Sequence, residues 1–393
     1  MPLPQVNSQH IQLCYAGAYL GSIKGESAIT VEAAAAECRI DVHEARRLFP
    51  TDDALRSAVR EFAFARLREY APVTPGASIE EQINELVFGA FRLASTEGHA
   101  YRMIIKYPPA TGEFPEVFTE FAKNVYEQNI PRAEAKIRAI LLGLNGLCFL
   151  TVYGVARSLS PVVKNRLFDT FAQAATRLIY TDDFEKLEPS RFTPVEPIEL
   201  ADPERTAIYE AAILSSIDHI GAAPMLNDAA KRAGIPLGRA HALIDGDAAL
   251  LNETIQYAEN KLAHYQRTQF VALPDQRSRL DRLKAMALGY IGYAIENRDE
   301  YVVGFLWANT PIVPSSPLRE EKSDSGADVF GVLLKIIGEE SPNPLTQFEF
   351  AFLAWSLVSG IADVMSNGFL SDLPEDRKWA AASEMVDAFC SVF

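Results

Sequence analysis

The sequence has few of the residues that mark disulfide frameworks, metal sites or catalytic centres. Its four cysteines form no C-x-x-C pair and are scattered through apolar stretches, at Cys14, Cys38, Cys148 and Cys390. We therefore expect free, buried thiols in a reducing compartment, with neither disulfides nor a zinc site. The six histidines are dispersed, and there is no H-E-x-x-H, G-x-S-x-G, Walker or dinucleotide motif. These absences argue against an enzyme, and they predict no catalytic residue, no metal and no cofactor.

Positive charge is the second shortage. The chain has 37 lysines and arginines against 52 aspartates and glutamates, which gives a formal net charge of -15. An acidic chain stays soluble, but it repels nucleic acid unless its basic groups gather on one face. The N-terminus is polar and carries Pro2 and Pro4, so we expect no signal peptide and a cytoplasmic protein.

Long hydrophobic runs are scarce as well. The stretch 139–156 carries no charge, and its length is at the lower edge of what spans a membrane. The corresponding stretch later in the chain carries Glu349 and Asp363. We therefore expect a helix buried by protein and no membrane partner.

What the sequence does contain is helical periodicity and internal similarity, with weak strand signals throughout. The similarity appears at three offsets, which grow along the chain because the second half has an additional Pro-rich loop at 310–327. A shift of 195 residues aligns Ala34 with Ala229, Leu48 with Leu243, Leu55 with Leu250 and Tyr70 with Tyr265. A shift of 200 aligns Gly89 with Gly289 and Tyr101 with Tyr301. A shift of 214 aligns Gly146 with Gly360 and Gly154 with Gly368. We therefore predict two diverged copies of one all-α architecture.

The domain boundaries follow from this alignment and from an acidic, proline-containing segment with no helical period. We expect a head at 8–70, further helices at 76–180, a linker at 181–204, a second head at 205–265 and further helices at 276–393.

Each copy opens with the pattern of a helix-turn-helix unit. In copy one, Thr30 is placed to cap a short helix, a turn follows near residues 39–41, and a second short helix ends near Phe49. Thr51 then caps a longer helix. In copy two, Gly234 suits a left-handed turn and Pro236 opens the next helix.

These stretches resemble the DNA-binding head of the TetR family of bacterial transcriptional regulators. That family has a Thr-Val start, an Ile-Ala pair, an Ala-Gly-Val-Ser turn, a recognition helix and a Phe-x-Ser-Lys-x-x-Leu close. Copy one matches at Thr30, Val31 and 49–55, and copy two matches at its turn. The resemblance continues into 86–105 and 286–305, which look like effector and dimerisation helices.

The resemblance implies two TetR-like helical subunits fused as an intramolecular pseudo-dimer. In that family, two subunits pair through their last two helices as a four-helix bundle. Here the segments 133–154, 161–180, 346–368 and 375–392 would form it, with close approach at the Gly146/Gly360 and Gly154/Gly368 pairs.

The heads also depart from the family pattern. The family's phosphate-contacting lysine is replaced by Asp52 and Asp247, and its turn glycine by Arg39 in copy one. A DNA-binding head needs cationic or amide side chains directed at phosphates and base edges. The candidate DNA-binding residues are Thr30, His43, Arg46, Arg47, Arg232, Arg239 and His241. The alternative for Arg46, Arg47 and Arg239 is a solvated helix surface, paired with Glu44 or Asp245.

Aromatic residues lie on the helices where the resembled family encloses an effector. The candidate pocket residues are Phe88, Phe91, Tyr101, Tyr290, Tyr293, Tyr301 and Trp307. Aromatic residues at helical spacing are more often core. Even so, we expect some of them to line an apolar pocket in at least one copy.

The sequence therefore predicts a ligand-responsive transcriptional regulator that acts as a repressor. Its expected partners are a duplex DNA operator and a small apolar effector. The operator would have an asymmetric sequence, because the two heads differ. The sequence leaves open whether the whole chain forms a further homodimer. The competing hypothesis is a scaffold that lost DNA binding and serves as a ligand sensor or protein-interaction adaptor, which the acidic charge and the missing lysines favour.

Overall fold

A computed structural model describes residues 8–106, 116–152, 156–181, 191–196, 202–218, 223–273, 278–301, 329–338, 344–367, 370–371 and 373–390. Every regular element within these residues is a helix. The prediction of an all-α fold is therefore confirmed. The loop 310–327, Gly154, Gly368 and Trp307 lie outside the described residues.

The first half of the chain begins with a small head that is followed by longer helices. The head consists of α1 (Ser8–Lys24), a 3-10 turn at Glu26–Ala28, α2 (Val31–Cys38), α3 (Val42–Leu48) and α4 (Asp52–Tyr70). The helices after it are α5 (Ile79–Thr96), α6 (Gly98–Lys106), α7 (Glu116–Glu127), α8 (Ala133–Val152) and α9 (Pro161–Tyr180).

The second half repeats this order. Its head consists of α10 (Pro203–Asp218), α11 (Leu226–Ala233), α12 (Leu237–Leu243) and α13 (Gly246–Val271). It is followed by α14 (Arg279–Glu296), α16 (Val329–Gly338), α17 (Pro344–Asn367) and α18 (Glu375–Cys390). Asp202 accepts hydrogen bonds from the amides of Glu204 and Arg205 (both 3.1 Å). Because of this cap, α10 already begins inside the segment 181–204 that was expected to be a linker.

The helix bounds of the two halves recur at the offsets found in the sequence. Both ends of α2 and α11 are related by the offset of 195, and so are both ends of α3 and α12. The offset of 200 relates both ends of α5 and α14, and the offset of 214 relates the first residues of α9 and α18. The two halves therefore share the positions of these helices, whereas other pairs differ in length: α4 has 19 residues and α13 has 26.

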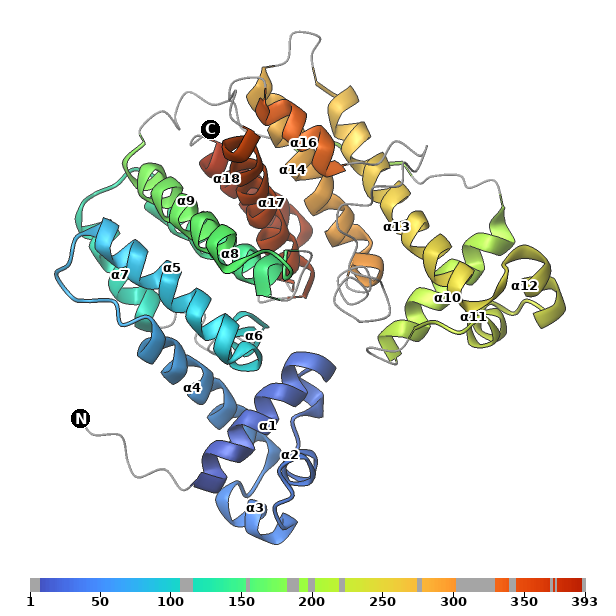
Figure 1. Cartoon of the computed structure of the whole chain (residues 1–393), viewed down its shortest axis with the longest axis horizontal. Coiled ribbons are helices and arrows are strands. Elements are labelled where there is room, and N and C mark those ends of the chain that lie inside the picture. Colours follow the sequence, from blue (N-terminus) through green and yellow to red (C-terminus); the bar gives the residue numbers. More distant parts are fainter. Residues whose placement is uncertain are drawn as a thin grey trace.

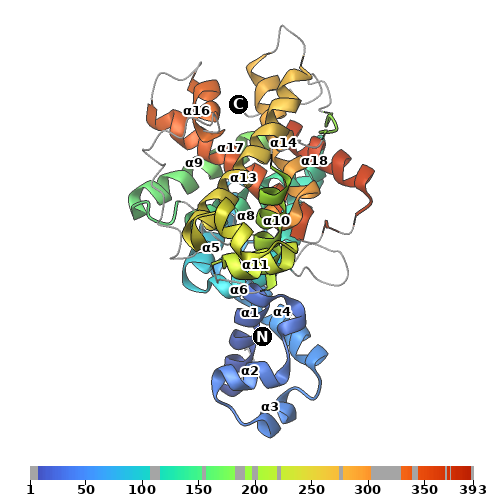
Figure 2. The ribbon, with the colours of Figure 1, turned by 90° about the vertical axis from the view of Figure 1, so that its right-hand side faces the viewer.

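The two heads lie at separate corners of the molecule, and α4 and α13 connect them to the central layer of helices (Figure 1). A perpendicular view shows α2 and α3 projecting from one end (Figure 2). The helices α8, α9, α17 and α18, from both halves of the chain, pack against one another in the centre. These are the four segments that the sequence assigned to a bundle.

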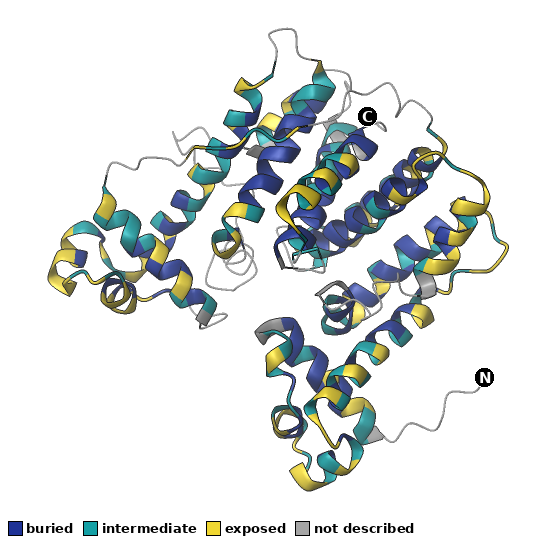
Figure 3. Ribbon diagram, turned by 180° about the vertical axis from the view of Figure 1, so that it is seen from behind, coloured by how far each residue is buried: buried dark blue, intermediate teal, exposed yellow. Residues whose placement is uncertain are grey.

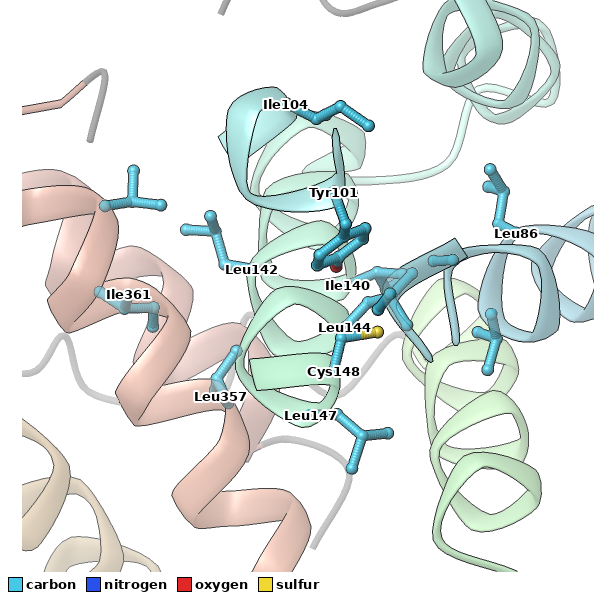
Figure 4. Close-up of a cluster of buried hydrophobic side chains, with 14 of the residues drawn as sticks. Leu86, Tyr101, Ile104, Ile140, Leu142, Leu144, Leu147, Cys148, Leu357 and Ile361 are labelled. Carbon is cyan, nitrogen blue, oxygen red and sulfur yellow. The ribbon is translucent and has the colours of Figure 1, made fainter. Parts of the chain in front are cut away.

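The centre of the fold is the crossing of α8 and α17. Leu142 of α8 and Leu357 and Ile361 of α17 lie at this crossing, while Tyr101 points at the other side of α8 near Cys148 (Figure 4). Buried residues are concentrated on these central helices, whereas the heads carry more exposed surface (Figure 3).

Two central helices are long and apolar enough to cross a membrane by length and composition. They are Ala133–Val152 and Thr346–Ser366, and 78% and 67% of their apolar windows are buried inside the fold. Such burial is typical of the core helices of a soluble protein.

Candidate functional sites in the heads and the second half

The turn between the two short helices of each head has the same backbone conformation. Arg39 and Gly234 both adopt the left-handed region, with φ of 56° and 70°. The amides that follow them, of Ile40 and Ile235, each donate to the carbonyl of the residue five positions earlier, at 2.9 Å. The left-handed region costs a non-glycine residue roughly 1–2 kcal/mol. The missing glycine in the first head therefore lowers stability without changing the turn.

Short polar side chains set the first head's helix starts. The Thr30 hydroxyl accepts from the amide of Ala33 (3.2 Å), and the Thr51 hydroxyl accepts from Ala54 (3.1 Å). Asp41 caps α3 by accepting from the amides of His43 (2.9 Å) and Glu44 (3.2 Å). Both predicted threonine caps are confirmed. The Asp41 carboxylate therefore caps the start of α3.

The two aspartates that stand where the resembled family has lysine make the same contact. Asp52 Oδ1 accepts from the backbone amide of Val31 (2.9 Å), and Asp247 Oδ1 accepts from that of Leu226 (2.7 Å). Each carboxylate thus lies at the N-terminus of the first short helix, where the helix dipole favours negative charge. This contact explains physically why aspartate is found at both positions.

Arg46 and Arg239 are both paired, but with other acids than expected. Arg46 donates to Glu32 at 2.6–3.0 Å and to the carbonyl of Pro50 (3.2 Å), with Asp52 at 3.4 Å. Arg239 donates to Glu204 at 2.6 and 2.8 Å. The expectation of Glu44 or Asp245 as partner is wrong, because the pairs join neighbouring helices rather than positions within one helix.

The Arg46 guanidinium hydrogen bonds hold the pKa of Glu32 below its ordinary value. Both arginine pairs are substantially exposed. An exposed ion pair contributes little to stability, so a phosphate could replace either acid at small cost.

The remaining DNA-binding candidates lie on the outer surface of the heads. The side chains of His43, Arg47, Arg232 and His241 are exposed. Two further exposed cations, Arg39 and Lys231, flank the turns and were not among the candidates. Their position beside a turn was the signal that could have found them.

The first head is attached to the rest of its half by specific side-chain contacts. The Ser22 hydroxyl lies 2.8 Å from His99 Nδ1 on α6, and the ring of Tyr19 packs edge-on against His99. Glu97 accepts from Arg66 and, at 2.7 Å, from the hydroxyl of Tyr15. The core of this head is therefore continuous with the main core.

The second head instead has its own small core within α10–α13. Ile208, Leu226 and Leu250 are completely buried in it. Among the described residues, α13 is the element that joins this core to the helices of its half.

The aromatic candidates of the first half lie in packed core. Phe91 stacks on Phe168 with ring centroids 4.1 Å apart, Tyr101 is buried, and Phe88 is partly buried against the same core. None of the three lines a described cavity.

The second half holds an apolar cavity of about 130 Å³ between α13, α14, α16, α17 and α18. Of the aromatic candidates, Tyr290 lines it, while Tyr293 and Tyr301 belong to an adjoining buried cluster with Tyr265. Sequence reasoning missed most of the lining, because no local pattern identifies it. The lining residues are Leu262, Gln266, Leu283, Met286, Ala287, Tyr290, Leu333, Ala354, Trp355, Leu357, Val358, Val386 and Cys390.

Part of the linker between the halves, residues 191–196, is fixed to the second half. The side-chain amide of Gln269 accepts from the amide of Thr193 (2.8 Å) and donates to its carbonyl (2.7 Å). Phe192 stacks on Trp379 with ring centroids 3.7 Å apart, and it also lies against Gly292, where a Cβ would be 2.3 Å from the ring. The second half thus holds this part of the linker by both polar and aromatic contacts.

No cluster of three or more His, Cys, Asp or Glu that could hold a metal ion occurs in the described part of the chain. Its four cysteines are free, and three of them are buried, while Cys38 is only partly so.

Comparison with known proteins places one segment of the chain. Residues 283–389, which span most of α14 to nearly the end of α18, match the family model described as "Tetracyclin repressor-like, C-terminal domain". No curated protein gives a significant match. The segment that surrounds most of the cavity is therefore similar to the C-terminal domain of tetracycline repressor-like proteins.

Proposed function

We propose that the protein is a TetR-like, ligand-responsive transcriptional regulator, a cytoplasmic repressor, in which two diverged copies of one subunit form a covalent pseudo-dimer. The observation that carries this proposal is the recurrence of helix bounds in the two halves at the offsets of 195, 200 and 214 that the sequence shows. The family match of residues 283–389 supports it for the second half. The packing of α8 and α9 against α17 and α18 supports the pseudo-dimer.

The recognition helices in this proposal are α3 and α12. Their support is the identical turn conformation before each helix and the exposure of His43, Arg47, Arg239 and His241. In helix-turn-helix proteins the second helix enters the major groove, and paired heads meet half-sites about 34–36 Å apart. Because the two recognition helices differ at nearly every exposed position, the operator would have two unlike half-sites.

The ligand-responsive part of the proposal rests on the cavity. It is lined almost entirely by apolar side chains, with Tyr290 and Gln266 as polar exceptions. Ligand pockets of this type are typically apolar with few polar anchors.

The test is a salt titration of binding to a duplex selected from a random library. Replacement of Arg47 by Ala removes a phosphate contact, so it should reduce the magnitude of the salt slope by about one without changing sequence preference. Arg239→Ala should cost roughly 1–3 kcal/mol on the preferred sequence and relax specificity there. If the wild-type chain binds no duplex even at low ionic strength, the regulator hypothesis is wrong.

A second candidate is a sensor or adaptor that no longer binds DNA. The observation in its favour is that Asp52 and Asp247 present carboxylates at the N-termini of both first short helices, in an acidic chain. Ligand binding without duplex binding in the same titration would support this candidate.

The pseudo-dimer has a separate test. Light scattering at low concentration should give one chain of 43.4 kDa, and a further dimer would appear only as concentration rises. Halves that are expressed separately should either associate or aggregate, because each would expose the face that α8 and α17 now bury. Two halves that are each stable and do not associate would contradict the pseudo-dimer.

A further inference from the structure

The two halves fill their centres differently. In the second half, α14, α16, α17 and α18 surround the apolar cavity. Their counterparts by order, α5, α7, α8 and α9, enclose the side chains of Phe121 and Phe168, both completely buried, and Phe91 stacks on Phe168. Neither of the two cavities described lies among α5, α7, α8 and α9.

One position contributes directly to this difference. At the offset of 214 that relates α9 to α18, Phe168 corresponds to Ala382, and neither residue has exposed surface. Ala382 precedes Val386 and Cys390 by four and eight positions on α18, so the three share one face of the helix. Val386 and Cys390 line the cavity. A phenyl ring is therefore present in the first half where the second half has a methyl group beside the cavity.

The cavity size sets the size of a ligand. An engineered apolar cavity of about 150 Å³ stays dry and binds benzene or xenon. The cavity in this protein is about 130 Å³. It can therefore take a molecule of about one aromatic ring.

The polar groups that line the cavity do not require a charged ligand as a partner. The Tyr290 hydroxyl lies 3.4 Å from the Ser359 hydroxyl, and the Gln266 side-chain amide donates to the carbonyl of Met286 (3.3 Å). Burial raises the pKa of the Cys390 thiol to about 12, so that the thiol is neutral. A charged ligand would lose its hydration here without gaining a partner.

We propose that the chain binds one ligand, in its second half only, and that this ligand is an uncharged, apolar molecule of about one aromatic ring. The proposal rests on the ligand-responsive regulator proposed above and names the ligand class and the stoichiometry of its site. A dimer of two identical subunits would carry two such sites, whereas this proposal assigns one to the chain.

The experiment is titration calorimetry of the full-length chain with benzene and with indole, together with melting curves in the same solutions. The wild-type chain should bind benzene at one molecule per chain, with a rise in Tm. Ala287→Leu fills the cavity and should abolish binding while the Tm of the free protein stays equal or rises. Ala380→Leu adds the same atoms on the exposed face of α18 and should bind like the wild type.

A converse variant tests the asymmetry. Phe168→Ala opens space in the first half and should raise the benzene stoichiometry from one to two; if this variant does not fold, Phe168→Leu in the Ala287→Leu background should regain one site. Binding of two molecules to the wild type, retention of binding by Ala287→Leu, or absence of binding to the wild type would each overturn the proposal. None of these outcomes involves DNA, so they are separate from failure of the duplex titration.

Discussion

Gly146 on α8 and Gly360 on α17 meet without a side chain between the two helices. A Cβ on Gly146 would lie 1.7 Å from the carbonyl oxygen of Ser356, and a Cβ on Gly360 would lie 1.8 Å from that of Leu142. Both obstacles are backbone atoms of the facing helix, so a rotamer change cannot remove them. The contact between the two halves of the chain therefore depends on these two glycines.

Substitution of either glycine should push α8 and α17 further apart at this contact. We expect Gly146→Ala and Gly360→Ala each to destabilise the protein by roughly 1–3 kcal/mol or more, the range for overpacking a close-packed core. Urea unfolding followed by circular dichroism measures this. Gly238→Ala is the matched control, because a Cβ at Gly238 meets no atom within 4 Å. Alanine is the better helix former there, so the control should be neutral or stabilised by up to about 1 kcal/mol. Equal effects at all three positions would contradict the close approach.

The aspartates of the heads should contribute to stability through the helix starts they bind. Asp52→Ala and Asp247→Ala each remove the acceptor for a first-turn amide and should cost about 0.5–2 kcal/mol, as removal of a helix cap does. Asp53→Ala is the control, because its side chain is 88% exposed and its ion pair with Arg56 lies at the surface. It should stay within about 0.5 kcal/mol of the wild type. Amide hydrogen exchange at Val31 and Leu226 reports on the two contacts locally. Unchanged exchange in the Asp52 and Asp247 variants would show that these carboxylates are not structural.

Glu97 should make part of the first half acid-sensitive. Burial raises its pKa, but hydrogen bonds from Arg66 and Tyr15 outweigh that and leave it below the ordinary value. A carboxylate with a lowered pKa stabilises the fold above its unfolded pKa, about 4.3 for glutamate, and this contribution disappears as pH falls through the folded pKa. Glu97→Gln should therefore lower the free energy of unfolding at pH 7. The difference from the wild type should shrink as the pH falls below about 4. Measurement of unfolding free energy against pH checks this; a difference that is constant with pH would contradict it.

The cysteines should differ in reactivity. Burial raises the pKa of the thiols of Cys14, Cys148 and Cys390 to about 12, and Cys38 is only partly buried. Because the thiolate is the reactive form, a thiol reagent at about pH 8 should label Cys38 first and the other three only as the protein opens. A Cys38→Ser variant should remove the fast phase. Four thiols that react at one rate would show that the burial is not maintained in solution.

Local features of the heads could be predicted from the sequence, because they depend on neighbours in the chain. The caps by Thr30 and Thr51 and the left-handed turn at Gly234 are of this kind. The partners of Arg46 and Arg239 could not be predicted, since Glu32 and Glu204 lie on other helices whose approach depends on the whole head.

The cavity was harder to predict than the fold. The aromatic pattern indicated Tyr290, which lines it, but equally Phe91, which is in packed core beside Phe168. Whether a space stays empty depends on the summed side-chain volumes of several helices, and no single periodic pattern records that sum. The close approach at Gly146 and Gly360 could be predicted, because the offset of 214 aligns these two glycines and a glycine on each helix permits close contact of the backbones.

Because α8 and α17 belong to one polypeptide, their association cannot be undone by dilution. Covalent linkage of two binding partners typically holds them at an effective concentration of the order of millimolar, far above the abundance of free subunits in a cell. A weakening substitution at this contact would leave the halves together where a two-chain dimer would come apart. Each half can therefore change its sequence at this contact without losing its partner to dilution.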